Sequence, residues 1–272
     1  MMEVVFMSSF SGLPREKGQE TDRKFIEALA RGLDVLRAFQ PGDGFLGNQE
    51  IAQRTGLPKS SVSRLTYTLT QLGYLGYSER LEKYQLGSGV LALGYAFISN
   101  LAIRQVARPL MQELANNTGA AIGLADRDRL EMIFVEYSAP VNVTTFKHEI
   151  GDKMPLAQSS TGRGYLAALP EEERNYFLGY LERKAGENWP RIKAGVDEAV
   201  ESYRQRGFCC SFGDWDRDVN GISVPLVMSQ GNIYSFNAGG PAYRLTPEFL
   251  RKEVAPLLKN MVRNIEASLI RY

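Results

Sequence analysis

The spacing of apolar residues divides the chain into two parts with different periodicities. Near the amino end, apolar side chains recur every three or four positions, which places them on one face of an α-helix. This first stripe consists of Phe25, Ile26, Leu29, Leu33, Leu36 and Phe39. After the segment NNTG (116–119), apolar and polar residues alternate over several short runs, which is typical of β-strands. The pattern predicts a helical amino-terminal part followed by an α+β part.

The amino-terminal part is predicted to contain three helices followed by a β-hairpin. The segment QPGDG (40–44) ends the first helix, and Gly56 supplies a turn that commonly needs a positive φ. Asn48 is suited to cap the second helix, and Pro58 is suited to open the third. The expected elements are helices at 25–39, 49–55 and 58–72 and strands at 74–77 and 84–86.

Four residues of this part have the spacing of a helix-turn-helix. Ala52, Gly56, Val62 and Leu65 stand at relative positions 0, +4, +10 and +13. The first must be small where two helices cross, the second must permit the turn, and the last two plug the crossing. With a helix before it and a hairpin after it, this set predicts a winged helix-turn-helix. The alternative is a plain helical hairpin.

The next segment is predicted to be one linker helix, which starts near Val90 and continues past Asn100 to about Leu114. Its apolar residues cover more than one face: Leu91, Leu93, Tyr95, Phe97 and Ile98. We expect one face to contact the winged helix and another to contact a partner subunit. A dimer also suits a DNA reader, because two half-sites about 34 Å apart need two recognition helices.

The rest of the chain is predicted to form an α+β domain of antiparallel strands flanked by helices. The expected strands are at 120–126, 130–138, 141–150, 221–227 and 232–240. The expected helices are at 161–169, 170–183, 192–206 and 247–270.

Composition narrows the classes of partner. The chain has 272 residues, of which 44% are hydrophobic, and this is enough for about two domains with real cores. A net charge of +1 means that any nucleic-acid site must be local. Cys209 and Cys210 are adjacent, which fits neither a disulfide framework nor a metal site, so we expect a reduced, cytoplasmic compartment. No apolar run approaches the roughly 20 residues of a membrane span. We expect no membrane partner, cofactor or metal.

One stretch is locally basic and rich in hydroxyl groups. No acidic residue occurs between Glu50 and Glu79, whereas Arg54, Lys59 and Arg64 do. Charge alone leaves two interpretations equal, a surface for a phosphate backbone and an ordinary solvated face, and the helix-turn-helix spacing favours the first. The predicted contacts to double-stranded operator DNA are Lys59, Ser60, Ser61, Ser63, Arg64, Tyr67 and Thr68, with Arg80 in the wing.

These residues have different expected roles on DNA. Arg64 is suited to bidentate hydrogen bonds with guanine, because its planar guanidinium matches O6 and N7. Lys59 and the serines are expected to hold phosphates. Tyr67 either contacts the backbone or only packs. Arg80 and Lys83 could reach DNA from the wing, although Glu79 and Glu82 weaken that expectation.

A second candidate site lies where MPLAQSSTGRG (154–164) leads into a predicted helix. Ser159, Ser160 and Thr161 bring hydroxyls and free backbone N–H groups together at the start of this helix. Such a place favours a carboxylate or another anion. The alternative is simple capping of the helix by a serine.

Several blocks of the chain resemble the IclR family of bacterial transcriptional regulators. They are FIEALARGLDVLRAF (25–39), EIAQRTGLPKSSVSRLTYTLTQLGYL (50–75), YQLGSGVLALGYAFISN (84–100), AQSSTGRGYLAALP (157–170) and GISVPLV (221–227). The resemblance implies a winged helix-turn-helix, a linker helix and a GAF-like effector domain. It also implies dimers that pair into tetramers, and DNA affinity that a small molecule modulates.

The resemblance also implies which residues line the effector pocket. Phe146 and Met154 would form an apolar wall, and Asn237 would anchor a polar group. The implied set is Phe146, Met154, Ser160, Thr161, Gly162, Ser211, Val219, Gly221, Asn237 and Gly239. One departure from the family's pattern is the bulky, acidic segment SFGDWDRDVNGISVPL. Within it, Trp215 could stack on an aromatic ligand or Arg217 could pair with a carboxylate; either could equally belong to a lid or to the surface.

These observations together predict a ligand-responsive transcriptional regulator. Its expected parts are a mobile tail (1–22), a winged helix-turn-helix (23–86), a linker helix (87–103) and an effector domain (104–272). The alternatives are a small-molecule-converting enzyme domain fused to a winged helix, and an architectural DNA-binding protein without a ligand. We expect no catalytic residues, because the chain has no GxSxG motif and its lone histidine, His148, is more often a surface residue than a catalyst, although Glu or Lys could act as a base.

Overall fold

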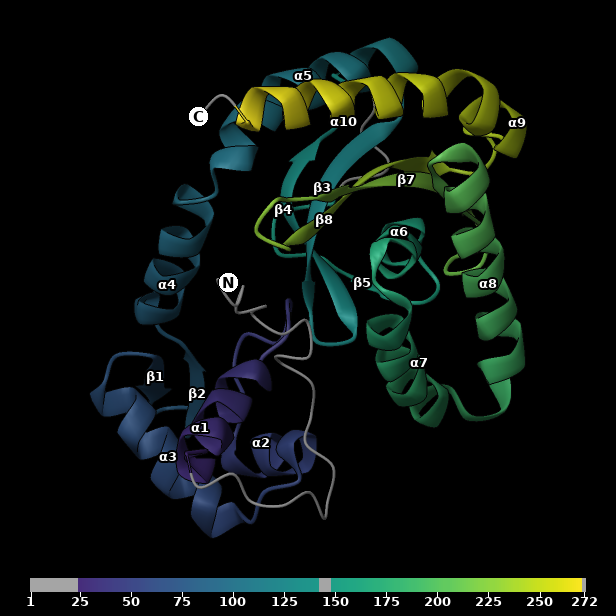
Figure 1. Cartoon of the computed structure of the whole chain (residues 1–272). Coiled ribbons are helices and arrows are strands. Elements are labelled where there is room, and N and C mark those ends of the chain that lie inside the picture. Colours follow the sequence, from purple (N-terminus) through teal and green to yellow (C-terminus); the bar gives the residue numbers. More distant parts are fainter. Residues whose placement is uncertain (1–23, 142–147, 271–272) are drawn as a thin grey trace, which may run out of the picture. The chain divides into compact units, whose positions relative to one another are not determined.

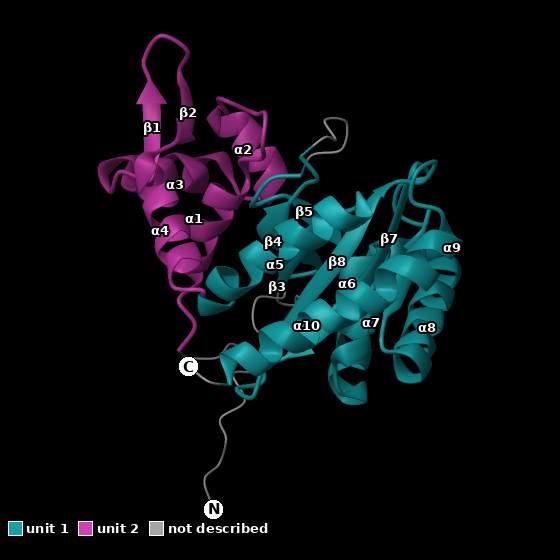
Figure 2. Cartoon of the chain, turned by 90° about the horizontal axis from the view of Figure 1, so that it is seen from above, with its two compact units in different colours: residues 1–14, 102–272 teal, residues 15–101 magenta. Residues whose placement is uncertain are grey.

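The computed structural model of the chain describes residues 24–141 and 148–270. The predicted tail and most of the strand predicted at 141–150 lie outside these ranges. The chain divides into two compact units, one ending at Leu101 and the other continuing from Ala102 (Figure 2). Each unit is built around its own hydrophobic core.

The amino-terminal unit is a winged helix-turn-helix, as predicted. Its helices are α1 (Glu27–Arg37), α2 (Asn48–Thr55), α3 (Lys59–Gln71) and α4 (Ser88–Ser99), and its hairpin pairs β1 (Leu75–Ser78) with β2 (Lys83–Leu86) (Figure 1). Gly56 has a φ of +69°, so it makes the predicted turn between α2 and α3. The predicted cap is wrong by one residue, because Asn48 is already helical and Gly47 precedes the helix. The Gly47 N–H instead donates to the carboxylate of Glu50 (2.7 Å).

The crossing of α2 and α3 is closed by the residues that the spacing singled out. Val62 is fully buried, and Ala52 and Leu65 pack partly buried against the same core. Thr66 is also fully buried on α3. Its hydroxyl is satisfied inside the unit, because it donates to the carbonyl of Val62 (3.0 Å). The inward face of α3 is therefore fixed by packing, and its other face is left to solvent.

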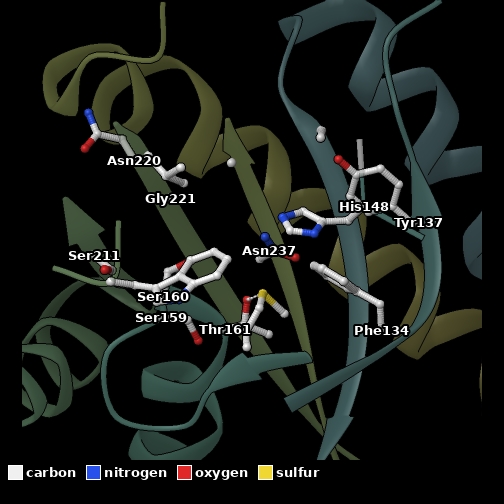
Figure 3. A pocket seen from close by; sticks show the side chains of 15 residues that line it. Phe134, Tyr137, His148, Ser159, Ser160, Thr161, Ser211, Asn220, Gly221 and Asn237 are labelled. Atoms are coloured by element: carbon white, nitrogen blue, oxygen red, sulfur yellow. Dashed lines mark hydrogen bonds between the residues drawn. The ribbon is translucent and has the colours of Figure 1, made fainter. Parts of the chain in front are cut away.

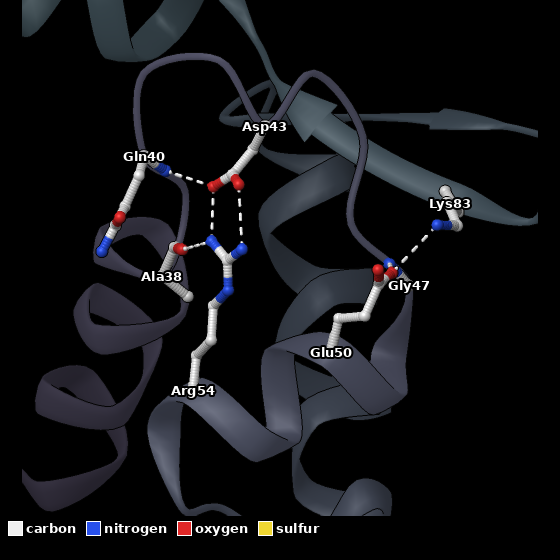
Figure 4. A network of polar contacts seen from close by, with 7 residues as sticks. All are labelled: Ala38, Gln40, Asp43, Gly47, Glu50, Arg54 and Lys83. Carbon is white, nitrogen blue, oxygen red and sulfur yellow. Dashed lines mark hydrogen bonds and ion pairs between the residues drawn. The ribbon is translucent and has the colours of Figure 1, made fainter.

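Two charged contacts tie the loops of this unit to α2 (Figure 4). The Arg54 guanidinium pairs with the Asp43 carboxylate and donates to the carbonyl of Ala38 (2.8 Å). Lys83 in β2 pairs with Glu50 (3.0 Å). The hydrogen bond from Arg54 lowers the pKa of Asp43 from its ordinary value of 3.8 to about 2. Arg54 and Lys83 are thus engaged inside the unit, and Lys59 and Arg64 remain as the basic residues of α3.

The predicted linker helix is divided in two, which corrects the expectation of one helix from Val90 to Leu114. Helix α4 ends at Ser99, and α5 (Ala102–Thr118) begins after Asn100 and Leu101. The side-chain amide of Asn100 donates to the carbonyl of Ala96 (2.8 Å), so that carbonyl is satisfied without continuing the helix. Within the described residues, no single helix is long and apolar enough to cross a membrane, and α4 and α5 meet that test of length and composition only when taken together.

The carboxyl-terminal unit is built on one antiparallel sheet with the strand order β5-β4-β3-β8-β7-β6. The strands are β3 (Ala121–Asp128), β4 (Glu131–Ser138), β5 (Lys153–Pro155), β6 (Cys209–Phe212), β7 (Val219–Val227) and β8 (Ile233–Pro241). Strands β5 and β6 were not predicted, because each is too short for an alternating pattern to stand out.

Helices cover both faces of this sheet and make the unit α+β, as predicted (Figure 1). Helices α5 and α10 (Ala255–Leu269) pack together on one face. Helix α6 (Ser160–Ala168) lies on the other face, with α7 (Glu171–Ala185) and α8 (Trp189–Arg206) beside it. The helix predicted at 247–270 is interrupted: a short turn, α9 (Pro247–Phe249), and a π-helical segment (Leu250–Val254) precede α10. Pro256 has no backbone N–H, so it cannot donate the helical hydrogen bond to the carbonyl of Lys252. The interruption coincides with this missing bond, because Lys252 lies inside the π-helical segment.

We predict that replacing Asp43 by asparagine destabilises the amino-terminal unit in a pH-dependent way. The folded-state pKa of Asp43 is depressed, so its contribution is present above the ordinary pKa near 3.8 and is lost as the pH falls toward 2. Urea unfolding of the wild type and of Asp43→Asn should differ most near neutral pH, and the difference should shrink between about pH 4 and pH 2. Glu79→Gln, at the exposed tip of the wing, is the matched control and should show no such convergence. A difference that stays constant over this pH range would rule out the proposed linkage.

Candidate functional site

The outward face of α3 carries the polar residues that the sequence singled out for DNA. Lys59, Ser60, Ser63, Arg64, Tyr67 and Thr68 are exposed, and Ser61 is half-buried. Tyr67 is 66% exposed, so it does not pack inside the unit. Of the two roles considered for it, contact with the DNA backbone stays a prediction. The face is polar and protruding, as is needed for a helix that enters a groove.

Most of these side chains are not committed to other protein groups. Within the described residues, Ser60, Ser63 and Arg64 have no hydrogen bond or ion pair from their side chains. Lys59 donates to the side chain of Gln49 (3.2 Å), and the Thr68 hydroxyl donates back to the carbonyl of Arg64 (3.0 Å). Arg80 is exposed at the wing between Glu79 and Glu82.

The carboxyl-terminal unit contains a cavity whose floor is one row of small residues across the sheet. The strand register aligns Ala121 of β3, Gly239 of β8, Gly221 of β7 and Ser211 of β6. All four line a cavity that opens to solvent. A Cβ on Gly221 would lie 2.7 Å from the Ser160 hydroxyl. The absence of side chains at Gly221 and Gly239 thus deepens the hollow, and at Gly221 it permits the close approach of α6.

The start of α6 forms one end of the cavity. Ser159 caps the helix: its hydroxyl accepts from the N–H of Gly162 (3.0 Å) and donates to the carbonyl of Pro155 (2.8 Å). Capping is therefore correct for Ser159, but it leaves Ser160 and Thr161 on the cavity wall. Gly162 does not line the cavity, because it packs so closely on Leu156 that a Cβ would overlap the backbone of that residue.

Several polar atoms at the cavity lack a good protein partner. The Asn237 Oδ1 is buried and has no hydrogen bond within the described structure. The Ser160 hydroxyl likewise has no partner among the described residues, and the Thr161 hydroxyl reaches only the sulfur of Met154 (3.7 Å). A buried polar group without a partner costs about 1–3 kcal/mol, so the Asn237 Oδ1 marks a place where a polar ligand would be stabilising.

The opposite wall is aromatic (Figure 3). The His148 ring centroid lies 5.4 Å from that of Phe134, 5.8 Å from that of Tyr137 and 6.1 Å from that of Trp215. The His148 Nδ1 is 3.1 Å from the Asp152 carboxylate. Interpreting His148 as a surface residue is therefore wrong, since its ring belongs to the cavity wall. Burial raises the pKa of Tyr137 to about 12, so this phenol stays neutral at ordinary pH.

The charges around the cavity favour an anion. Among the described residues that line it, none is acidic, and the lining includes Ser159, Ser160 and Thr161 at the amino-terminal end of α6, where the helix dipole favours negative charge. No group of three or more His, Cys, Asp or Glu side chains in the described ranges could hold a metal ion. The polar lining at the start of α6 is therefore suited to an organic anion.

The structure gathers most of the implied pocket residues in this one cavity. Those that line it are Met154, Ser160, Thr161, Ser211, Val219, Gly221, Asn237 and Gly239. Phe146 lies outside the described residues, and Gly162 supports the wall from behind. The cavity residues that were not in that set are Ala121, Phe134, Tyr137, His148, Ser159, Trp215 and Asn220. Except for Ser159 and Trp215, which the sequence had singled out, their signal is weak, because they come from separate segments that only the folded structure brings together.

Comparison with known proteins gives matches to both units. Residues 28–79 match the family model "IclR helix-turn-helix domain", and residues 95–267 match "Bacterial transcriptional regulator IclR C-terminal". The chain is 33% identical to the HTH-type transcriptional regulator TsaQ1/TsaQ2 of Comamonas testosteroni, over 92% of this chain and 91% of that protein.

Solved structures agree. The crystal structure of an IclR family transcriptional regulator from Brucella abortus is 48% identical, with a TM-score of 0.87 over 94% of this chain and 97% of that one. An IclR homolog from Microbacterium hydrocarbonoxydans, solved with 4-hydroxybenzoate, is 22% identical, with a TM-score of 0.70 over 90% of this chain and 100% of that one. At that identity the likeness shows the fold alone.

Proposed function

Because the chain belongs to the IclR family of bacterial transcriptional regulators, we propose that a small organic acid in the carboxyl-terminal cavity adjusts the affinity of α3 for operator DNA. The chain is a DNA-binding regulator of the IclR type, and the relatives that it matches are transcriptional regulators rather than enzymes. The observation that carries the proposal is the buried, unpartnered Oδ1 of Asn237 in the cavity that Ser160 and Thr161 at the start of α6 also line. We infer that it works in the cytoplasm, where bacterial DNA lies.

DNA reading is assigned to the outward face of α3. Arg64 is exposed and has no acidic partner among the described residues, so its guanidinium is available for the O6 and N7 atoms of a guanine. Lys59 and the serines at the start of α3 support it by holding phosphates. Arg54 pairs with Asp43 and Lys83 pairs with Glu50, so these two cations are less available to bind the phosphates of DNA.

Self-association is proposed from two apolar faces that the amino-terminal unit leaves exposed. Just before α1 the exposed residues are Phe25 and Ile26, on α1 they are Leu29 and Leu33, and on α4 they are Leu91, Leu93, Tyr95 and Phe97. Leu91 is 74% exposed and Tyr95 is 70% exposed, which is costly for large apolar side chains. A second copy of the chain would cover them and would also supply the second recognition helix that a two-fold operator needs. The resemblance adds that such dimers pair into tetramers.

The ligand is proposed to be a small organic acid with a second polar group. Its carboxylate would accept hydrogen bonds at the start of α6, from Ser160 and Thr161. A hydroxyl elsewhere on the ligand would donate to the Asn237 Oδ1, which otherwise stays unpaired. The 4-hydroxybenzoate bound by the Microbacterium homolog has both groups, which supports this class of ligand.

The ligand acts by population shift. It can change DNA affinity only if it binds two arrangements of the dimer unequally. A nearly complete switch needs about 5.5 kcal/mol of differential affinity.

We predict that Arg64→Ala lowers affinity for selected operator DNA by about 1–3 kcal/mol and relaxes preference at one base pair. The measurement is a gel-shift titration on DNA enriched from a random library and on its single-base variants. Lys59→Ala should instead weaken binding uniformly and reduce its salt dependence. Arg191→Ala, at the exposed start of α8, is a control that should have no effect. An equal loss of affinity on selected and random DNA would show that Arg64 does not read a base.

We predict that charging the apolar faces of α1 and α4 converts the dimer into monomers. Leu29→Glu combined with Leu91→Glu places two carboxylates in the proposed interface, where they would lose hydration without a partner. Sedimentation velocity should show about half the mass of the wild type. Leu81→Glu, at an exposed apolar residue of the wing, is the control and should leave the mass unchanged. An unchanged mass in the double variant would place the interface elsewhere.

We predict that removing two hydroxyls at the start of α6 impairs ligand binding without affecting DNA binding. Ser160→Ala with Thr161→Val keeps the size of both side chains, and each lost hydrogen bond to a carboxylate costs about 1.5–3 kcal/mol. Isothermal titration with 4-hydroxybenzoate and benzoate measures the first effect, and gel shift without ligand measures the second. Ser268→Ala in α10 is the control. If the double variant binds these acids as the wild type does, the start of α6 is not the anion site.

A further inference from the structure

The acidic segment between β6 and β7 is joined to α6 by an ion pair with one buried partner. Arg163 lies in α6, two residues after Thr161, and its side chain is only 5% exposed. Its Nε donates to the carbonyl of Ala157 (3.1 Å). One Nη donates to the carbonyl of Cys210 (3.0 Å) and to the Asp214 carboxylate (2.7 Å).

The residues around the Arg163 guanidinium leave space for it and pair with its charge. Gly195 of α8 approaches so closely that a Cβ there would overlap the Arg163 guanidinium. A buried guanidinium needs an anion, since removal of one partner leaves an uncompensated charge in a poorly hydrated place. Asp214 is the carboxylate that pairs with it among the described residues. The pair therefore fixes the backbone at Asp214 against α6.

The next residue, Trp215, is one of the rings that line the cavity. Its ring stacks on His148 at 6.1 Å with an angle of 28° between the planes. Trp215 is 36% exposed, so core packing alone does not hold it in place. Two polar contacts lie beside the two rings: Asp214, the residue before Trp215, pairs with Arg163, and the Asp152 carboxylate lies 3.1 Å from the His148 Nδ1.

We propose that Asp214 is a positioning residue that, through Arg163, holds Trp215 over the cavity, and that the Trp215–His148 pair selects planar acids over non-planar acids of similar size. A flat ring can lie against the face of one of these side chains without separating the two. A puckered ring of the same size makes a poorer face contact. This inference rests on the proposed function, because it assumes that the cavity binds an organic acid.

The test compares benzoate, which is planar, with cyclohexanecarboxylate, which has the same number of carbon atoms and a puckered ring. The variants are Asp214→Asn and, as the matched control, Asp218→Asn, which removes the same charge from the same segment outside the Arg163 pair. Isothermal titration of the full-length protein gives the ratio of the two dissociation constants. Wild type and Asp218→Asn should prefer benzoate by about three- to tenfold, and Asp214→Asn should lose most of that preference.

A second variant separates positioning from folding. Trp215→Ala leaves the Asp214–Arg163 pair in place and should reproduce the loss of preference for the planar acid. Gel shift on operator DNA checks that each variant is folded. Unchanged preference in either Asp214→Asn or Trp215→Ala overturns the inference.

The control also distinguishes this inference from the proposed function. If wild type binds neither acid and no related organic acid, the proposed function of the cavity fails and this inference fails with it. If wild type binds both acids but discriminates no better than Asp214→Asn, only the positioning role is refuted.

Discussion

The contact between the start of α6 and the central strands of the sheet is the constraint on which the ligand site depends. Helix α6 can approach at its first turn because Gly221, in register with Gly239 and Ala121, has no side chain to meet Ser160. The Ser223 hydroxyl then donates to the carbonyl of Ser160 (2.5 Å) and fixes the helix to β7. Any side chain larger than hydrogen at Gly221 would push against Ser160 and displace the end of the helix that faces the cavity.

The two units manage charge in related ways. In the amino-terminal unit, Arg54 and Lys83 are paired with acids, so that a chain with a net charge of +1 still presents a basic face on α3. In the carboxyl-terminal unit, the cavity is free of acidic lining among the described residues, and Asp214 is turned toward the buried Arg163. In both units, ion pairs inside the fold decide which polar groups remain for a partner.

Local features were predictable from sequence, and features that depend on register were not. The helix-turn-helix could be predicted because Ala52, Gly56 and Val62 act through spacing along a short stretch. The α+β class and most elements followed from periodicity. The break at Asn100 was not predicted. There the side-chain amide replaces a backbone N–H as the donor to the Ala96 carbonyl, and a pattern of apolar residues does not reveal such a contact. The pocket residues were inferred from the family resemblance. The contact of His148 with Trp215 and the Asp214–Arg163 pair were not predicted, because each joins segments that are far apart in sequence.

The row of small residues on the sheet has a consequence for how such regulators diversify. Glycine backbone gives the cavity its depth but carries no side chain that could discriminate between molecules. Discrimination is left to groups above the sheet, including the ring of Trp215 on a surface loop that tolerates insertion and exchange. Sequence changes in that loop could therefore alter which ligand is recognised, without changes in the strands or in the DNA-binding unit.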